Sequence, residues 1–228
     1  MNVKELEAKV KALENQVRIL TDIEEIKTLQ KTYGYYLEHW MSQEIIDLFS
    51  DDPEVSLTLT AGTYLGKRRI AEYFNRLKDP GPEFLHQVMQ LSGVVTVDAG
   101  GTTAKGRWYG FGAVALPSDK GVRQFFMGGI YGGEYVKEDG VWKFERLRFD
   151  ASYTAAPATG WVAPKRLAPA ETRPALAGAQ ADVPRTFSPR YPSGYIFPFH
   201  YRHPVTGKKT SEDERNASID GVKDWKYS

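Results

Sequence analysis

The histidine at position 86 stands at the head of an apolar segment that reads as a β-strand, downstream of a helical segment carrying Tyr33, Tyr36 and Glu38. An imidazole titrates near neutrality, and a carboxylate bonded to one ring nitrogen leaves the other nitrogen to accept a proton. These residue types predict acid/base chemistry near neutral pH, with His86 as the base and Glu38 orienting it. A phenol from Tyr33 or Tyr36 could donate to a developing oxyanion or protonate a leaving hydroxyl.

The strand that carries His86 has a mixed face. Alternation places Phe84, His86, Val88 and Gln90 on the same side, as a cavity lining requires. For a histidine taken alone, a core residue bonded to backbone is the more common case, and tyrosines near it more often form a wall than take part in chemistry. The residues by themselves leave both interpretations open.

Aromatic and basic side chains elsewhere are candidate substrate contacts. Arg107 and Tyr109 share one face of a later strand, and a buried Arg107 would need an anion, either a substrate or an internal acid. Tyr131 alternates with Ile130, and the sequence leaves open which of the two points inward. The candidate lining residues are Trp40, Phe84, Arg107, Tyr109, Tyr131, Tyr195 and Phe197.

The composition narrows the class of protein. With 228 residues, 41% hydrophobic and 13% aromatic, the chain can bury one sizeable core and should form one domain with an appendage. Its 30 basic and 29 acidic residues leave a formal charge of +1, too balanced for a nucleic-acid partner. No apolar run is long enough for a membrane span or a signal peptide, and the absence of cysteine excludes disulfides and thiolate metal sites. We expect a soluble, cytoplasmic protein that binds a small molecule and no metal.

The first 22 residues read as a helical extension. Their apolar residues recur every three or four positions, which is the a/d seam of a coiled coil. The seam consists of Val3, Leu6, Val10, Leu13, Val17 and Leu20. Because so short a seam rarely holds two chains together unaided, an oligomer contact and an amphipathic helix lying on its own domain have equal weight.

Residues 23–161 read as an α+β domain. The helix turns an apolar face inward from Ile23 to Tyr33 and ends at Trp40-Met41. A second helix over 42–49, with Ser42 as its N-cap, and a third over 67–77 flank a hairpin formed by 55–59 and 63–65. Four long strands follow as an antiparallel meander, over 84–97, 102–116, 122–137 and 141–153. Glycines within the strands favour bends, so three helices and a curved sheet should enclose a cone-shaped pocket.

Residues 162–228 have a different composition, in which prolines and an aromatic run replace the periodic apolar pattern. They are expected to form an extended arm and not a second domain. The run from Tyr191 to Tyr201 is too aromatic to remain in water. It should dock on its own domain or a neighbouring subunit, or cover the pocket as a lid through which Tyr195 and Phe197 touch the ligand.

Several motifs carry a resemblance to a known family. Tyr33 and Glu38 are five residues apart at the end of the first helix, and His86 stands at the entry to the first long strand. Gly129-Ile130-Tyr131, the hairpin from Asp139 to Lys143 and Gly160-Trp161 complete the pattern. Over about residues 23–161 the chain resembles the SnoaL-like branch of the nuclear transport factor 2-like superfamily.

The resemblance implies an α+β barrel and a lyase that needs no cofactor. Members include dehydratases, dehydrohalogenases, isomerases, ring cyclases and carbon–carbon lyases of lignin-derived diaryl compounds, beside binding modules. We expect loss of water, or retro-aldol-like loss of formaldehyde from a diarylpropanediol, on an aromatic or phenolic substrate, in a homo-oligomer that is a dimer or a trimer. An isomerase or cyclase on a similar substrate stays open. So does a non-catalytic binding module, because the family's enzymes usually have an aspartate where this chain has Glu38.

Overall fold

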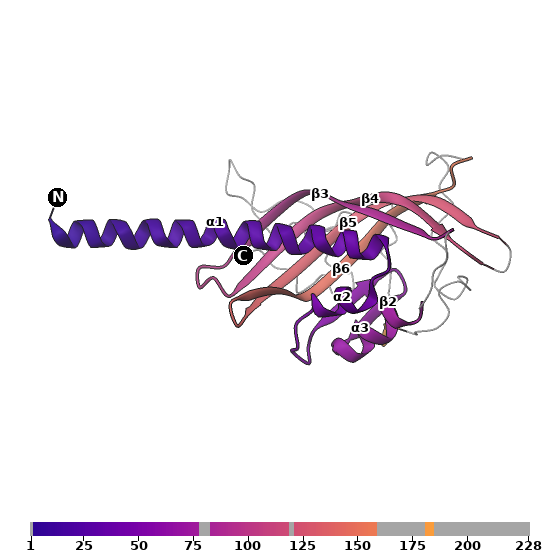
Figure 1. Ribbon diagram of the computed structural model, residues 1–228, viewed down its shortest axis with the longest axis horizontal. Helices are drawn as coiled ribbons and strands as arrows, with labels where there is room; N and C mark the ends of the chain where they lie inside the picture. The colour runs from indigo at the N-terminus through magenta and orange to yellow at the C-terminus, as the bar shows by residue number, and fades with distance from the viewer. Residues whose placement is uncertain (1, 78–82, 119–120, 159–180, 185–228) are drawn as a thin grey trace, which may run out of the picture.

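The computed structural model describes residues 2–77, 83–118, 121–158 and 181–184 (Figure 1). Its helices are α1 (Val3–Glu38), α2 (Ser42–Asp47) and α3 (Gly66–Asn75). Its strands are β1 (Ser56–Leu59), β2 (Gly62–Leu65), β3 (Leu85–Val97), β4 (Thr103–Leu116), β5 (Arg123–Glu138), β6 (Val141–Ala155) and β7 (Val183–Pro184). The predicted lid residues Tyr195 and Phe197 lie outside the described residues, as does most of the predicted arm.

The described strands form a single curved sheet with the order β3-β4-β5-β6-β1-β2-β7. The predicted antiparallel meander is confirmed, because β3, β4, β5 and β6 pair in sequence with antiparallel neighbours. The short hairpin of β1 and β2 is confirmed as well. It joins the sheet through a parallel pairing of β1 with β6, which the local pattern did not indicate.

Bulges and glycines allow the long strands to bend. The register shifts between Leu91 and Val94 in β3, and at two places between β5 and β6. At Gly112 in β4, an added Cβ would lie 1.7 Å from the carbonyl oxygen of Gln87 in β3. A side chain there would force the two strands apart, so glycine permits this close approach. The result is the curved sheet of an α+β fold.

The first helix has two different halves, as Figure 1 shows. Its C-terminal half lies on the sheet and buries one stripe of side chains. That stripe is Asp22, Ile26, Leu29, Gln30, Tyr33 and Leu37. Its N-terminal half projects beyond the sheet and leaves the whole predicted seam exposed. The interpretation of this segment as a helix lying on its own domain is therefore wrong.

The short elements close one end of the sheet near the C-terminus of α1 (Figure 1). Ser42 is the first residue of α2 and not its N-cap, since Met41 takes that position. The Ser42 hydroxyl instead donates to the Phe74 carbonyl at 3.0 Å and so ties α2 to α3. Among the residues described here, no helix combines the length and the apolarity needed to cross a bilayer.

Candidate functional site

The end of α1 places Trp40 in an unusual backbone conformation. After Glu38, the amide of Trp40 donates to the Leu37 carbonyl at 3.2 Å and the amide of Met41 donates to the Tyr36 carbonyl at 3.0 Å. This pair of bonds is the Schellman motif, which requires a left-handed residue that is usually glycine. Trp40 has a φ of 51°, so a bulky side chain occupies the strained position. Strain of this kind persists where surrounding contacts determine the position.

Those contacts form an aromatic cluster around Trp40. Its indole nitrogen donates to the Phe74 carbonyl at 2.8 Å, and the ring lies 5.6 Å from that of Phe74 and 6.2 Å from that of Tyr73. From β3 and the residue before it, His86 and Phe84 approach the indole edge-on at 5.8 and 5.9 Å between ring centroids. His86 and Phe84 stack on each other at 6.4 Å. The imidazole is therefore bounded by two aromatic rings.

His86 is the chemically informative member of this cluster. The residue is partly buried, its Nδ1 atom is fully buried, and among the described residues this nitrogen has no hydrogen-bond partner. Burial lowers the pKa of His86 to about 4, and the positive charge of Arg76 reinforces the shift. Buried polar atoms in proteins nearly always have a partner, so a buried Nδ1 without one points to a ligand.

Arg76, just after α3, is a site residue that the sequence reasoning missed. Its guanidinium lies 3.6 Å from the centroid of the Tyr73 ring and 4.8 Å from that of Trp40, and it donates to the Tyr73 carbonyl. The cation is thus held over aromatic faces beside the imidazole. The sequence predicted a helix over 67–77, but no local pattern indicated that Arg76 would fold back over Tyr73.

The predicted pairing of Glu38 with His86 is wrong. The Glu38 carboxylate accepts a hydrogen bond from the side-chain amide of Gln87 at 3.2 Å. Gln87 follows His86 in β3, and neighbouring residues of a strand point to opposite faces. Glu38 therefore lies with the exposed face of β3, while His86 lies with the inner face alongside Val88 and Gln90. The prediction that Phe84, His86, Val88 and Gln90 share a face is confirmed by the burial pattern.

The predicted tyrosines line the interior of the sheet. Tyr33 and Tyr131 are buried and meet edge-on with ring centroids 6.1 Å apart, and Tyr33 also meets Phe144 at 5.6 Å. The structure thus resolves the face of β5: Tyr131 points inward. Burial raises the pKa of Tyr33, and the neighbouring Tyr131 adds to the shift. Burial likewise raises the pKa of Tyr131, so both phenols keep their protons. Tyr36 is only partly buried.

A buried polar chain continues from the His86 face of β3 across to α1 and β5. Gln30 donates to Gln90 at 2.8 Å and accepts from the Tyr135 hydroxyl at 2.7 Å. Tyr135 in turn accepts from the Trp108 indole at 3.0 Å. Gln90 also donates to the Val88 carbonyl at 3.0 Å. The polar Gln30 inside the apolar stripe of α1 was the available sequence signal for this network.

Arg107 and Tyr109 are not brought to His86. They lie on the face of β4 opposite Trp108, which points inward to Tyr135. Tyr109 is 57% exposed, and Arg107 shares its face. The sequence predicted the alternation of β4 but did not show which of its two faces points inward.

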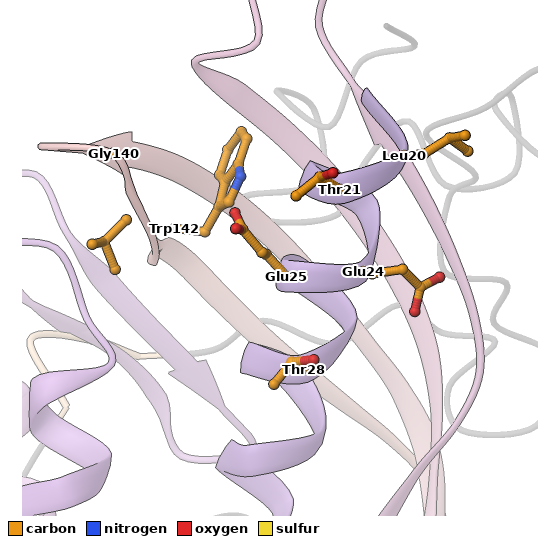
Figure 2. Close-up of a pocket in the computed structure, with 8 residues that line it drawn as sticks. Leu20, Thr21, Glu24, Glu25, Thr28, Gly140 and Trp142 are labelled. Atoms are coloured by element: carbon orange, nitrogen blue, oxygen red, sulfur yellow. The ribbon is translucent and has the colours of Figure 1, made fainter. Parts of the chain in front are cut away.

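The open hollow on the described surface lies away from these residues. It is a groove of about 650 Å³ between α1 and the β5–β6 turn, and none of the predicted site residues that the structure describes line it (Figure 2). Its wall includes Trp142, whose indole donates to the buried Asp22 at 3.0 Å. Asp22 also accepts from Lys137 at 2.6 Å and Arg18 at 3.2 Å. Burial alone would raise the pKa of Asp22, but these donors and their charges lower it, so the carboxylate anchors α1 to the hairpin.

Comparisons with known proteins agree with this architecture. The model of the SnoaL-like domain family matches residues 18–148, more than half of the chain. A candidate scytalone dehydratase from Novosphingobium aromaticivorans is 18% identical, with a TM-score of 0.51 over 67% of this chain and 99% of its own. A type 2 hexachlorocyclohexane dehydrochlorinase (LinA) is 19% identical, with a TM-score of 0.50 over 68% of this chain and 98% of its own.

A third solved structure is a nuclear transport factor 2-like protein from Salmonella enterica serovar Typhimurium. It is 15% identical, with a TM-score of 0.47 over 57% of this chain and 89% of its own. A comparison with curated proteins finds no match. The chain belongs to the SnoaL-like domain family.

Proposed function

We propose that this protein is a cofactor-independent lyase that acts on an aromatic or phenolic small molecule, with His86 as its general base. The observation that carries the proposal is the buried, unpartnered Nδ1 of His86 between the rings of Trp40 and Phe84. Aromatic walls suit an aromatic ligand, and an imidazole nitrogen without a protein partner is available to a substrate hydroxyl.

Arg76 gives the site a preference for negative charge. In the ligand-free protein, its charge and the burial of the imidazole keep His86 neutral. A phenolate or a developing alkoxide bound beside Arg76 would offset that charge and raise the basicity of His86 at the moment when it accepts a proton. Arg76 thus acts on the negative charge of the substrate, whereas Glu38 was expected to orient the imidazole.

Two eliminations use this arrangement. In dehydration, His86 takes a proton from carbon, the C–H electrons form the double bond, and the hydroxyl on the adjacent carbon leaves as water after gaining a proton. In the second, His86 takes the proton of a terminal hydroxyl of a diarylpropanediol, and the carbon–carbon bond breaks with release of formaldehyde. The electron pair then forms the alkene and expels the neighbouring hydroxyl as water. Tyr33 or Tyr36 would supply the proton, since Tyr33 remains protonated.

The names of two structural neighbours, a dehydratase and a dehydrochlorinase, agree with elimination chemistry. An isomerase or cyclase on a similar substrate would use the same base. A non-catalytic binding module is the second candidate, favoured by one observation: Glu38 binds Gln87 and leaves the imidazole without a carboxylate. A homo-oligomeric state is part of the proposal.

The direct test is a substrate panel. The purified protein, treated with a chelator, is incubated with aromatic alcohols and diarylpropanediols while product mass and free formaldehyde are followed. The proposal is supported if the parent protein forms a product that has lost water or formaldehyde and His86→Gln does not. His39→Gln, which removes an exposed histidine, should still form that product. Ligand binding without any change of mass or retention time would overturn it in favour of the binding module.

A further inference from the structure

The projecting half of α1 carries an unpartnered apolar stripe. All six seam residues are exposed, from 46% at Val10 to 71% at Val3. The stripe consists of Val3, Leu6, Val10, Leu13, Val17 and Leu20. Figure 1 shows this half of the helix extending past the sheet, where no described element of the same chain covers it. A continuous apolar stripe of this kind normally marks an interface.

The stripe faces away from the chain's own sheet. At about 100° per residue, Asp22 and Ile26 lie on the side of the helix opposite Val17 and Leu20. Asp22 and Ile26 are the first residues of α1 that are buried against the domain. A second helix could therefore lie along the stripe without displacing any contact of the domain. The stripe ends where the next two seam positions become Glu24 and Lys27.

We propose that residues 3–20 form a parallel, in-register, two-stranded coiled coil with the same residues of a second copy of this chain. The two kinds of seam position hold different residues: every a position is valine and every d position is leucine. β-Branched residues at a with leucine at d favour two strands in parallel. Within a parallel coil, these residue types thus favour two chains over three or four.

The flanking charges support the parallel direction. Taking Val3 as an a position, Glu7 and Glu14 are e positions and Lys9 is a g position. In a parallel pair, Lys9 faces Glu14 of the second copy, which is an attractive contact. In a fully overlapping antiparallel pair, g faces g and e faces e, so Glu7 would face Glu14 of the second copy and Lys9 would face the uncharged Gln16. Only the parallel arrangement makes these charges complementary.

The short length of the seam is offset by a helix that is already formed. Asn2 and Glu5 make a reciprocal capping box at its start, with the Glu5 amide donating to the Asn2 side chain at 3.0 Å. At the other end the helix continues without a break into the half that is packed on the sheet. Association therefore does not have to nucleate a helix, which is the step that makes short isolated coiled coils weak.

The first test measures the association of the full chain by sedimentation velocity over a range of concentrations. A dimer is expected whose dissociation constant rises at least about a hundredfold in Leu13→Glu, since a buried leucine is lost from each chain. Ala8→Glu adds the same charge on the outer side of the helix, and the dimer should persist. A chain that is monomeric at every concentration would overturn the proposal. So would a dimer or larger assembly whose dissociation constant is unchanged in Leu13→Glu.

The second test determines the direction. The chain contains no cysteine, so Val3→Cys provides a unique thiol. Mild oxidation should link two chains through this position in the parallel coil, whereas Ala8→Cys, facing outward, should not. An antiparallel pair would separate the two Val3 positions by about 25 Å at 1.5 Å per residue. Likewise Glu14→Lys should weaken the parallel dimer, and adding Lys9→Glu should restore it; strengthening by Glu14→Lys alone would contradict the parallel direction.

Discussion

Trp40 and His86 lie edge to face with their ring centroids 5.8 Å apart, one on the left-handed residue that ends α1 and the other near the start of β3. The contact joins a strained backbone position to a buried imidazole. Phe84 stacks on the imidazole and completes this enclosure, and Arg76 adds a positive charge that lowers the pKa of His86 further. The following predictions test whether this enclosure controls His86 as proposed, and whether the surrounding polar contacts support the fold.

The stability of the fold should depend on the protonation of His86. Its pKa is about 4 in the folded chain, against an ordinary value of 6.5. Between these values the unfolded chain binds a proton that the folded chain does not, so stability is complete above about 6.5 and falls as the pH drops toward 4. The loss should be about 3 kcal/mol at pH 4, as measured by urea unfolding.

The matched variant for this prediction is His86→Phe, which keeps an aromatic ring between Trp40 and Phe84 but does not titrate. Its unfolding free energy should fall less steeply over the same pH range. His39→Gln, which removes an exposed histidine, should keep the parent slope. Equal slopes in His86→Phe and the parent protein would show that the imidazole is not held neutral by burial.

Tyr135 should be essential to the buried polar network. Tyr135→Phe removes the hydroxyl that accepts from Trp108 and donates to Gln30, leaving two buried partners unsatisfied. We expect a loss of about 2–4 kcal/mol in the free energy of unfolding, from about 1–2 kcal/mol for each orphaned group. Tyr35→Phe makes the same chemical change on a side chain that is 70% exposed and should alter stability by less than about 0.5 kcal/mol. Equal effects would argue against the network.

Asp22 should anchor the first helix to the β5–β6 hairpin. Asp22→Asn removes the charge that Lys137 and Arg18 contact and leaves both cations without their buried partner. Unfolding should become easier by about 3 kcal/mol. Asp47→Asn, an exposed position on α2, is the control. Hydrogen exchange should locate the loss in the middle of α1, and a loss confined to other elements would contradict the anchoring role.

Glu38→Gln distinguishes the observed contact from the one predicted from sequence. The carboxylate meets Gln87 and not His86, so the substitution should change turnover by less than about threefold. If Glu38 oriented the imidazole, turnover should instead fall by about 100-fold or more, as is typical when a residue of general acid/base catalysis is lost. The rate of product formation at neutral pH decides between these outcomes.

The long elements could be predicted because their signals are local. Alternation, glycine-rich turns and helix endings located the four meander strands to within a residue or two, for example 84–97 against Leu85–Val97. The parallel pairing of β1 with β6 depends on contacts between segments far apart in the chain, which no local pattern encodes. The inward phase of β4 and β5 was equally inaccessible, so the sequence left open whether Tyr131 points inward and did not show that Arg107 lies on the opposite face of β4 from Trp108.

The candidate site was predicted only in part, for a related reason. His86, Trp40 and Phe84 do meet, because helix end and strand start are strong local signals. Two contacts that determine the environment of His86 depend on where side chains point in three dimensions, which no local pattern indicates. Arg76 reaches the aromatic cluster from α3, and Glu38 turns toward Gln87. Burial, reinforced by the charge of Arg76, lowers the pKa of His86 from the expected value near neutrality to about 4.

The most direct test of the central claim is the pH dependence of kcat/KM for the substrate found in the panel, measured for the parent protein and for His86→Gln. The proposal predicts an acid limb near pH 4, the pKa of His86 in the free protein, and a loss of at least about 100-fold in His86→Gln. A His86→Gln protein that folds normally and turns over substrate at the parent rate would contradict the assignment of His86 as the base.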